Sequence, residues 1–107
     1  NLGGDNISPS KIENLLCLDE KIKQSFVYGD KKTYLVALVV TESEKNKKEI
    51  ELYIENLNKS LSVTEKIKKI KLINEEFTIE NGMLTPTLKL KRKKILEKYK
   101  EELEKLY

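Results

Sequence analysis

The amino-acid sequence predicts a small α+β fold, in which helices pack against a central sheet of about three strands. Two patterns support this class. Short continuous apolar runs bounded by turn residues are typical of buried strands, and apolar residues spaced by three or four positions indicate amphipathic helices. The 107 residues fit one small domain with a limited core. We therefore expect residues 1–107 to form a single domain.

The first helix is expected to begin just after Ser8. Serine is a favourable N-cap, and Pro9 suits the first helical position, where a backbone N–H is not needed. The apolar stripe of this helix is formed by Ile12, Leu15 and Leu16.

Two strands are expected next, at residues 26–28 and 34–40. The second is a continuous apolar run, as found in a strand that is covered on both faces. Residues 29–32, Gly-Asp-Lys-Lys, form the connecting turn. We expect an antiparallel hairpin at the centre of the sheet.

Two further helices are predicted from capping-box spacing and apolar periodicity. Thr41 with Glu44, and Ser62 with Glu65, have the spacing of a capping box. Apolar residues at helical spacing accompany each pair. Those after the first pair are Ile50, Tyr53, Ile54, Leu57 and Leu61, and those within and after the second pair are Val63, Ile67 and Ile70.

A third strand and a closing helix complete the predicted fold. Residues 71–73, Lys-Leu-Ile, form a short strand. The closing helix is amphipathic, with its apolar face formed by Ile95, Leu96, Tyr99, Leu103 and Leu106.

The most informative stretch for function is NGMLTPTLKLKR, residues 81–92. Asn81-Gly82 is a strong turn signal, and Pro86 fixes its own φ and favours an extended residue before it. From this short, stiff loop Lys89 and Lys91 project flexible side chains that end in compact charges. Such side chains are suited to binding a phosphate or carboxylate.

Charge and composition argue against several classes of function. The net charge of +3 is too small to indicate nucleic-acid binding, although residues 86–100 carry a local excess of positive charge. Arg92 is the only arginine of the sequence, so bidentate readout of phosphate or guanine is almost absent. Cys17 is a lone cysteine and there is no histidine, so we expect no disulfide framework and no metal site.

Nothing in the first residues indicates a secretory leader, and no apolar run approaches the length of a membrane span. We expect a cytoplasmic protein. Peripheral association with a membrane is left open, because basic residues of the last helix could face an anionic surface or bulk water.

Three stretches together resemble a known family. They are GGDNISPSKIENLL near the start, FVYGDKKTYLVALVV in the middle, and FTIENGMLTPTLKLKRKKILEKYKEELEKLY to the last residue. They are similar to the C-terminal domain of long-chain acyl-CoA synthetases, which belong to the adenylate-forming, AMP-binding superfamily. The resemblance implies a mobile C-terminal domain, with residues 1–7 as the strand and turn after a hinge.

The resemblance also implies an activity, namely that of an ATP-dependent, AMP-forming long-chain fatty acid:CoA ligase. The large N-terminal adenylate-forming domain would be the partner of this chain and would hold the ATP, Mg²⁺ and fatty-acid sites. AMP and CoA would complete the set of ligands in the full-length enzyme. We expect this chain by itself to be inactive and to bind none of these cofactors tightly, and we expect no nucleic-acid partner.

Two functional positions follow from the resemblance. The strand after the hinge lines the pantetheine tunnel of CoA in the family, so Gly4, with Gly3 beside it, would leave room for the thiol. Many members carry a PKTxSGK motif whose last lysine contacts the AMP phosphate and the substrate carboxylate. Aligning its threonine with Thr87 places that lysine at Lys91. Lys89 is the alternative, because Lys-Leu stands where the motif has Ser-Gly.

Each position also has a structural explanation. The two glycines alone are typical of a tight turn, and the lysine side chains could cover Leu88 and Leu90 at a solvated helix start. Two other classes of protein are alternatives for the whole chain. One is a stand-alone interaction module that docks a partner with its last helix, and the other is a small anion- or nucleic-acid-binding domain that uses residues 86–100.

Overall fold

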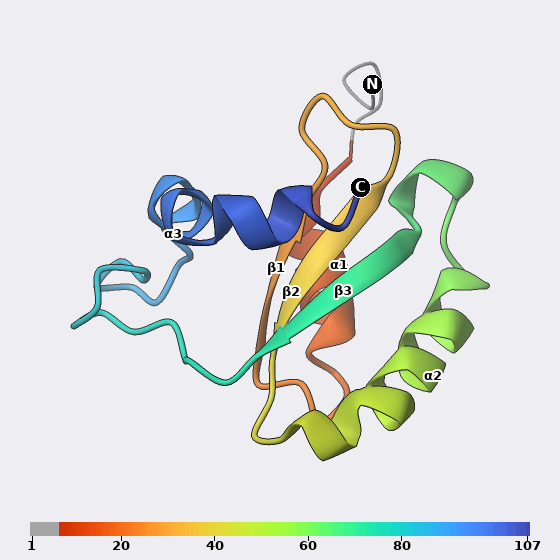
Figure 1. Cartoon of the computed structure of the whole chain (residues 1–107), viewed down its shortest axis with the longest axis horizontal. Coiled ribbons are helices and arrows are strands. Elements are labelled where there is room, and N and C mark those ends of the chain that lie inside the picture. The colour runs from red at the N-terminus through yellow and green to blue at the C-terminus, as the bar shows by residue number, and fades with distance from the viewer. Residues whose placement is uncertain (1–6) are drawn as a thin grey trace.

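The computed structural model, which describes residues 7–107, contains a three-stranded sheet with helices on both faces (Figure 1). The strands are β1 (Gln24–Tyr28), β2 (Leu35–Val40) and β3 (Ile67–Ile73), in the order β1-β2-β3. β1 pairs antiparallel with β2, and β2 pairs parallel with β3. The predicted α+β class is confirmed.

Every residue of β2 is buried, because its alternating side chains enter two separate apolar cores. Leu35, Ala37 and Val39 pack with residues of α1 (Pro9–Leu16) and α2 (Lys47–Asn58). The alternate residues 36, 38 and 40 pack on the opposite face with residues of α3 (Arg92–Glu104). Full burial of one such side chain contributes about 1.5–3 kcal/mol. Because β2 supplies buried side chains to both cores, it lies at the centre of the fold.

The start of the chain folds as its sequence predicts. The Ser8 hydroxyl accepts a hydrogen bond from the N–H of Lys11 at 3.3 Å, and Pro9 is the first residue of α1. β1 and β2 form the expected hairpin, although β2 alone is central and β1 lies at the edge.

Thr41 does not cap a helix, contrary to the prediction. It is only 2% exposed, and its hydroxyl accepts a hydrogen bond from the side-chain amide of Asn46 at 3.0 Å. Ser43 is the cap instead, since its hydroxyl accepts from the N–H of Lys45 at 3.1 Å. It begins the 3₁₀ turn η1 (Glu44–Asn46), which leads directly into α2.

The predicted helix over Val63, Ile67 and Ile70 is wrong. The capping box of Ser62 and Glu65 is present, but it caps only the short 3₁₀ turn η2 (Val63–Glu65). β3 begins two residues after this turn and includes the residues 71–73 that the sequence indicated.

A bulge in β3 explains why its apolar residues have helical spacing. Leu35 of β2 is paired with Ile67, and the next residue of β2 is paired with Lys69, so β3 contains one extra residue. The extra residue brings Ile67 and Ile70 onto the same face, where both pack in the α1 and α2 core. Their separation of three residues therefore arises within a strand.

The chain between β3 and α3 contains no regular element. Residues 74–91 leave the end of β3, extend past the β1 edge and return to α3, which lies across the strands on the face opposite α1 and α2 (Figure 1). A segment of this length without helix or strand is uncommon in a compact domain and is usually functional. No helix in the described part of the chain is long and apolar enough to cross a membrane.

Candidate functional site: the lysine loop and its anchors

Both candidate lysines lie on a short looped-back segment just before α3, which we call the lysine loop (residues 83–91). Leu84 and Leu90 form an isolated antiparallel bridge across it. The N–H of Lys91 donates to the carbonyl of Met83 at 2.8 Å, and that of Thr85 donates to the carbonyl of Lys89 at 2.8 Å. The lysine loop is therefore a miniature hairpin with residues 86–88 at its tip.

Thr85 closes the tip of this hairpin with both its backbone and its side chain. Its carbonyl accepts from the N–H of Leu88 at 2.8 Å, and its hydroxyl accepts from the N–H of Lys89 at 3.1 Å. The hydroxyls of Thr85 and Thr87 are also within hydrogen-bond distance, at 3.1 Å. These bonds fix the backbone of Lys89 while its side chain stays exposed.

Leu88, directly before Lys89, has an unusual backbone conformation. Its φ is 65°, in the left-handed region that glycine adopts freely and leucine rarely does. The side chain is 67% exposed, so burial does not hold it there. Strained residues of this kind cluster at functional sites. The expected turn at Asn81-Gly82 is also present, with φ of 80° at Gly82.

The surroundings of the two lysines are electropositive. Within residues 7–107, neither Lys89 nor Lys91 forms an ion pair. Lys91 is the N-cap residue of α3, whose first turn holds Arg92, Lys93 and Lys94 and no acidic residue. The helix dipole adds partial positive charge at the same end, so the sequence here opposes helix stability and favours an approaching anion.

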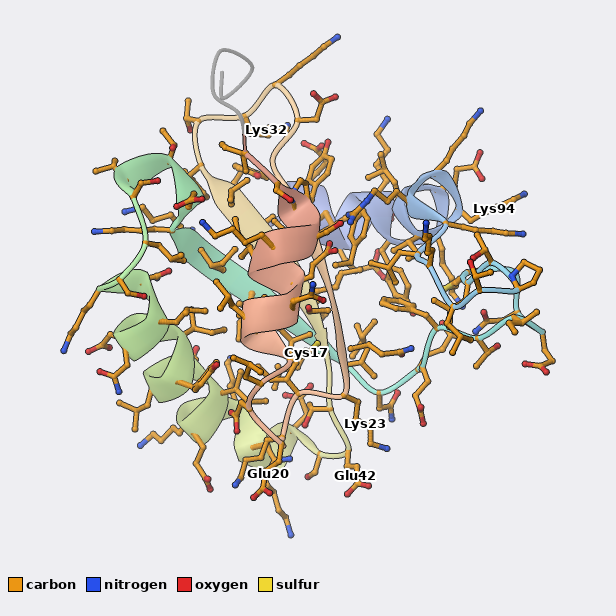
Figure 2. The ribbon with its side chains drawn as sticks, turned by 180° about the vertical axis from the view of Figure 1, so that it is seen from behind. Cys17, Glu20, Lys23, Lys32, Glu42 and Lys94 are labelled. Carbon is orange, nitrogen blue, oxygen red and sulfur yellow. The ribbon has the colours of Figure 1, made fainter. Side chains whose placement is uncertain are left out.

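An open groove of about 510 Å³ runs between the lysine loop, α1 and β1. Lys89 lines it and Lys91 does not. Figure 2 shows this side of the molecule, with Cys17 at the end of α1 and Lys23 nearby, both of which line the groove. Burial, and to a smaller extent the charge of Glu13, raises the pKa of the Cys17 thiol, which favours the neutral thiol over the reactive thiolate.

Two residues that line the groove, Gln24 and Arg92, also anchor the segment that carries the lysine loop. At its entry, the Gln24 side chain accepts from the N–H of Phe77 at 2.7 Å and donates to its carbonyl at 2.9 Å. At its exit, Arg92 donates two hydrogen bonds to the carboxylate of Glu13, at 2.7 and 2.8 Å. These bonds raise the pKa of the Arg92 guanidinium.

Glu13 and Gln24 were not predicted as parts of the site. One signal for Glu13 was available, because an acidic residue between the apolar positions Ile12 and Leu16 needs a cationic partner when it is buried. Arg92, the single arginine, is the residue suited to a bidentate pair. For Gln24 the sequence gives no comparable signal.

The predicted positions Gly3 and Gly4 lie outside the described residues, so their roles stay predictions. Within residues 7–107 no cluster of three or more His, Cys, Asp or Glu side chains could hold a metal ion.

Comparison with known proteins defines the class of protein. A sequence model of the AMP-binding enzyme C-terminal domain matches residues 2–107. The chain belongs to this family. The predicted resemblance is thereby confirmed over nearly the whole sequence.

The relatives make the class more specific. The chain is 34% identical to long-chain-fatty-acid–CoA ligase 6 of Rattus norvegicus, over 97% of the chain and 18% of the relative. It is 30% identical to long-chain-fatty-acid–CoA ligase FadD15 of Mycobacterium tuberculosis, over 98% of the chain and 22% of that enzyme. The chain thus spans about a fifth of the length of these relatives.

Solved structures agree with this fold. The A domain of carboxylic acid reductase from Segniliparus rugosus, in complex with AMP and a co-purified carboxylic acid, superposes with a TM-score of 0.83. It is 28% identical, and the match covers 99% of this chain and 19% of that one. The adenylation domain of the carboxylate reductase from Mycobacterium chelonae gives a TM-score of 0.82 at 30% identity, over 94% of this chain and 18% of the other.

Proposed function

We propose that this chain is the C-terminal domain of an ATP-dependent, AMP-forming ligase that joins long-chain fatty acids to CoA. Family membership and the alignment of two such ligases along nearly the whole chain support this proposal. The ATP, Mg²⁺ and fatty-acid sites belong to a large N-terminal domain, with which this domain works. The stand-alone interaction and anion-binding modules are not favoured, because neither accounts for this family match.

The lysine loop has the properties that the first half-reaction needs. A fatty-acid carboxylate attacks the α-phosphate of ATP, so two anions meet and negative charge builds up on the phosphoryl oxygens as pyrophosphate leaves. A lysine ammonium within ~4 Å offsets this charge by about 4 kcal/mol at an effective dielectric constant of 20. The rigid backbone and exposed ammonium of the loop suit a cation that enters a site on another domain.

The backbone of Leu88 supports one of the two lysines over the other. In the PKTxSGK motif a glycine precedes the functional lysine, and the threonine lies four residues before that lysine. Both Thr85 with Lys89 and Thr87 with Lys91 have this spacing. Of the two preceding leucines, only Leu88 has the positive φ that a glycine would adopt. The alignment with Thr87 favoured Lys91, whereas the backbone of Leu88 supports its alternative, Lys89, so we propose Lys89 as the adenylation lysine and keep Lys91 as the alternative.

In the second half-reaction a different face of the domain meets the reaction site of the N-terminal domain. After acyl-adenylate forms, rotation of the domain withdraws the lysine loop and brings in the strand that contains Gly4, with Gly3 beside it. The CoA thiol then attacks the acyl carbon and AMP leaves. A side chain at Gly4 would crowd the pantetheine, so the lack of a Cβ is useful there.

The test is to assay the full-length enzyme with palmitate, ATP, Mg²⁺ and CoA. Pyrophosphate, AMP and palmitoyl-CoA should all form, and the 107-residue chain alone should form none above a heat-inactivated control. Pyrophosphate without palmitoyl-CoA would move the second step to another acceptor, as in the 29% identical long-chain-fatty-acid–[acyl-carrier-protein] ligase AEE15 of Arabidopsis thaliana. No pyrophosphate with any fatty acid would contradict the whole proposal. A cytoplasmic location, with or without peripheral membrane binding, stays a prediction.

A further inference from the structure

A partly buried ion pair fastens the end of the lysine loop to helix α1: Glu13 is buried, whereas the Arg92 side chain is 39% exposed. Arg92 directly follows Lys91, and its two terminal nitrogens donate to the two carboxylate oxygens of Glu13, at 2.8 and 2.7 Å. Glu13 is only 6% exposed. A bidentate pair of this kind fixes the orientation of the guanidinium as well as its distance.

The pair is itself tied to the body of the domain. A carboxylate oxygen of Glu13 also accepts the backbone N–H of Val27 in β1 at 2.8 Å. Arg92 donates in addition to the hydroxyl of Ser10 at 3.3 Å, and its guanidinium lies over the ring of Phe26, 5.8 Å from the ring centre. Arg92 is thus held by α1 and β1 together.

Hydrogen bonds tie the lysine loop to itself more than to the sheet. In the described part of the chain, the hydrogen bonds of residues 78–91 stay within residues 76–91, apart from the bond between the Lys91 carbonyl and the N–H of Ile95. Packing of Met83 and Leu84 in the α3 core adds apolar contact. The direction of the loop therefore depends on this packing and on its polar anchors, and the Arg92 anchor lies three residues from Lys89.

Stability alone does not require this pair. Replacing an ion pair that contains a buried charge by uncharged residues of similar size is often neutral or stabilising, because the buried charge, here that of Glu13, need not be desolvated. What an uncharged pair loses is the fixed geometry of the two parallel hydrogen bonds.

We propose that Glu13 and Arg92 are positioning residues for adenylation, which hold the lysine loop so that Lys89 projects toward the reacting phosphate. This proposal rests on the proposed function. In this proposal both residues act through the lysine loop, and neither contacts the substrate. A displacement of about 1 Å at a reacting centre can lower a rate by about a hundredfold, so a loosened anchor is expected to be measurable.

The experiment compares stability with the two half-reactions in the full-length enzyme. Glu13→Gln alone leaves Arg92 charged without its partner and should lower the melting temperature. The double variant Glu13→Gln/Arg92→Gln leaves no unpaired charge and keeps an acceptor for Val27, so its melting temperature should recover. Its palmitate-dependent ATP–pyrophosphate exchange should nevertheless stay about tenfold or more below wild type, while palmitoyl-CoA formation from supplied palmitoyl-adenylate stays normal.

Arg92→Lys and a distant ion pair complete the design. Arg92→Lys keeps the positive charge but loses the two parallel hydrogen bonds of the guanidinium. It should therefore reproduce the selective loss of ATP–pyrophosphate exchange. Removing the ion pair between Lys32 and Glu104, which lies away from the lysine loop, by Lys32→Gln/Glu104→Gln should leave both half-reactions unchanged.

The outcomes separate this proposal from the function on which it rests. If exchange recovers together with the melting temperature in the double variant, the pair is merely structural and the positioning role is overturned. Lys89→Ala and Lys91→Ala are assayed in parallel. If one lysine is essential but the Glu13 and Arg92 variants exchange normally, only the positioning role fails. If neither lysine matters, the assigned role of the loop fails, and the positioning role fails with it.

Discussion

Replacing Leu88 by glycine tests whether the lysine loop carries backbone strain next to the candidate lysine. Its φ of 65° costs leucine about 1–2 kcal/mol, which glycine would relieve. Glycine loses about 0.5–1 kcal/mol through its greater freedom in the unfolded chain. The side chain is 67% exposed, so the burial that is lost is about a third of the 1.5–3 kcal/mol for a full leucine, roughly 0.5–1 kcal/mol. These effects nearly cancel, and Leu88→Gly should stay within about 0.5 kcal/mol of wild type.

The matched control is Leu90→Gly in the same hairpin. Leu90 is half-buried, lacks a positive φ and pairs with Leu84, so glycine there relieves no strain. It should lose about 2 kcal/mol from burial and chain entropy. Urea unfolding of the 107-residue chain, followed by circular dichroism, measures both free energies. Equal destabilisation by the two variants would refute the strain and would remove the reason for preferring Lys89.

Three further predictions concern the stability of the domain. Leu38→Ala, at a fully buried position of β2, should lower the free energy of unfolding by about 2–5 kcal/mol. Leu52→Ala, at a 60% exposed position of α2, should change it by less than about 0.5 kcal/mol. Equal losses in urea unfolding would contradict the assigned core. The hydroxyl of Tyr107 donates to the carbonyl of Tyr34 at 2.7 Å, so Tyr107→Phe should cost about 0.5–1.5 kcal/mol, and an unchanged melting curve would argue against this docking of the C-terminus. Hydrogen bonding to Lys32 lowers the pKa of Glu104 below its ordinary value of 4.5. The contribution of Glu104 to stability is therefore present above about pH 4.5 and is lost as pH falls through the lower, folded-state pKa. Glu104→Gln should flatten the acid side of a stability-versus-pH curve, and a curve parallel to that of wild type would exclude this contribution.

Local patterns predicted the elements whose hydrogen bonds and burial are themselves local. The cap and proline of α1 act within four residues, and the apolar run of β2 reflects simple burial on both faces. The spacing of Ile67 and Ile70 wrongly predicted a helix, because the bulge that produces this spacing depends on pairing with β2, about thirty residues earlier in the chain. Thr41 was wrongly predicted as a helix cap for a similar reason, since its backbone N–H donates to the carbonyl of Ile73 at the end of β3, which is distant in the sequence.

The candidate site divides in the same way. The turn, the proline and the lysines of residues 81–92 were visible in the sequence and pointed to an anion. The conformation of Leu88 was not visible, because leucine gives no indication of a positive φ. The partnership of Glu13 with Arg92 joins residues 79 positions apart and required the fold.

The most direct test of the account is the rate of palmitoyl-adenylate formation in the full-length enzyme with Lys89→Ala and, separately, Lys91→Ala. Removing one preorganised charge from the transition state costs on the order of 3 kcal/mol, about a hundredfold in rate. Lys89→Ala should lose at least about that factor in adenylation and keep palmitoyl-CoA formation from supplied adenylate, while Lys91→Ala stays near wild type. The reverse pattern would move the role to Lys91, and two near-normal variants would contradict the adenylation role of the lysine loop.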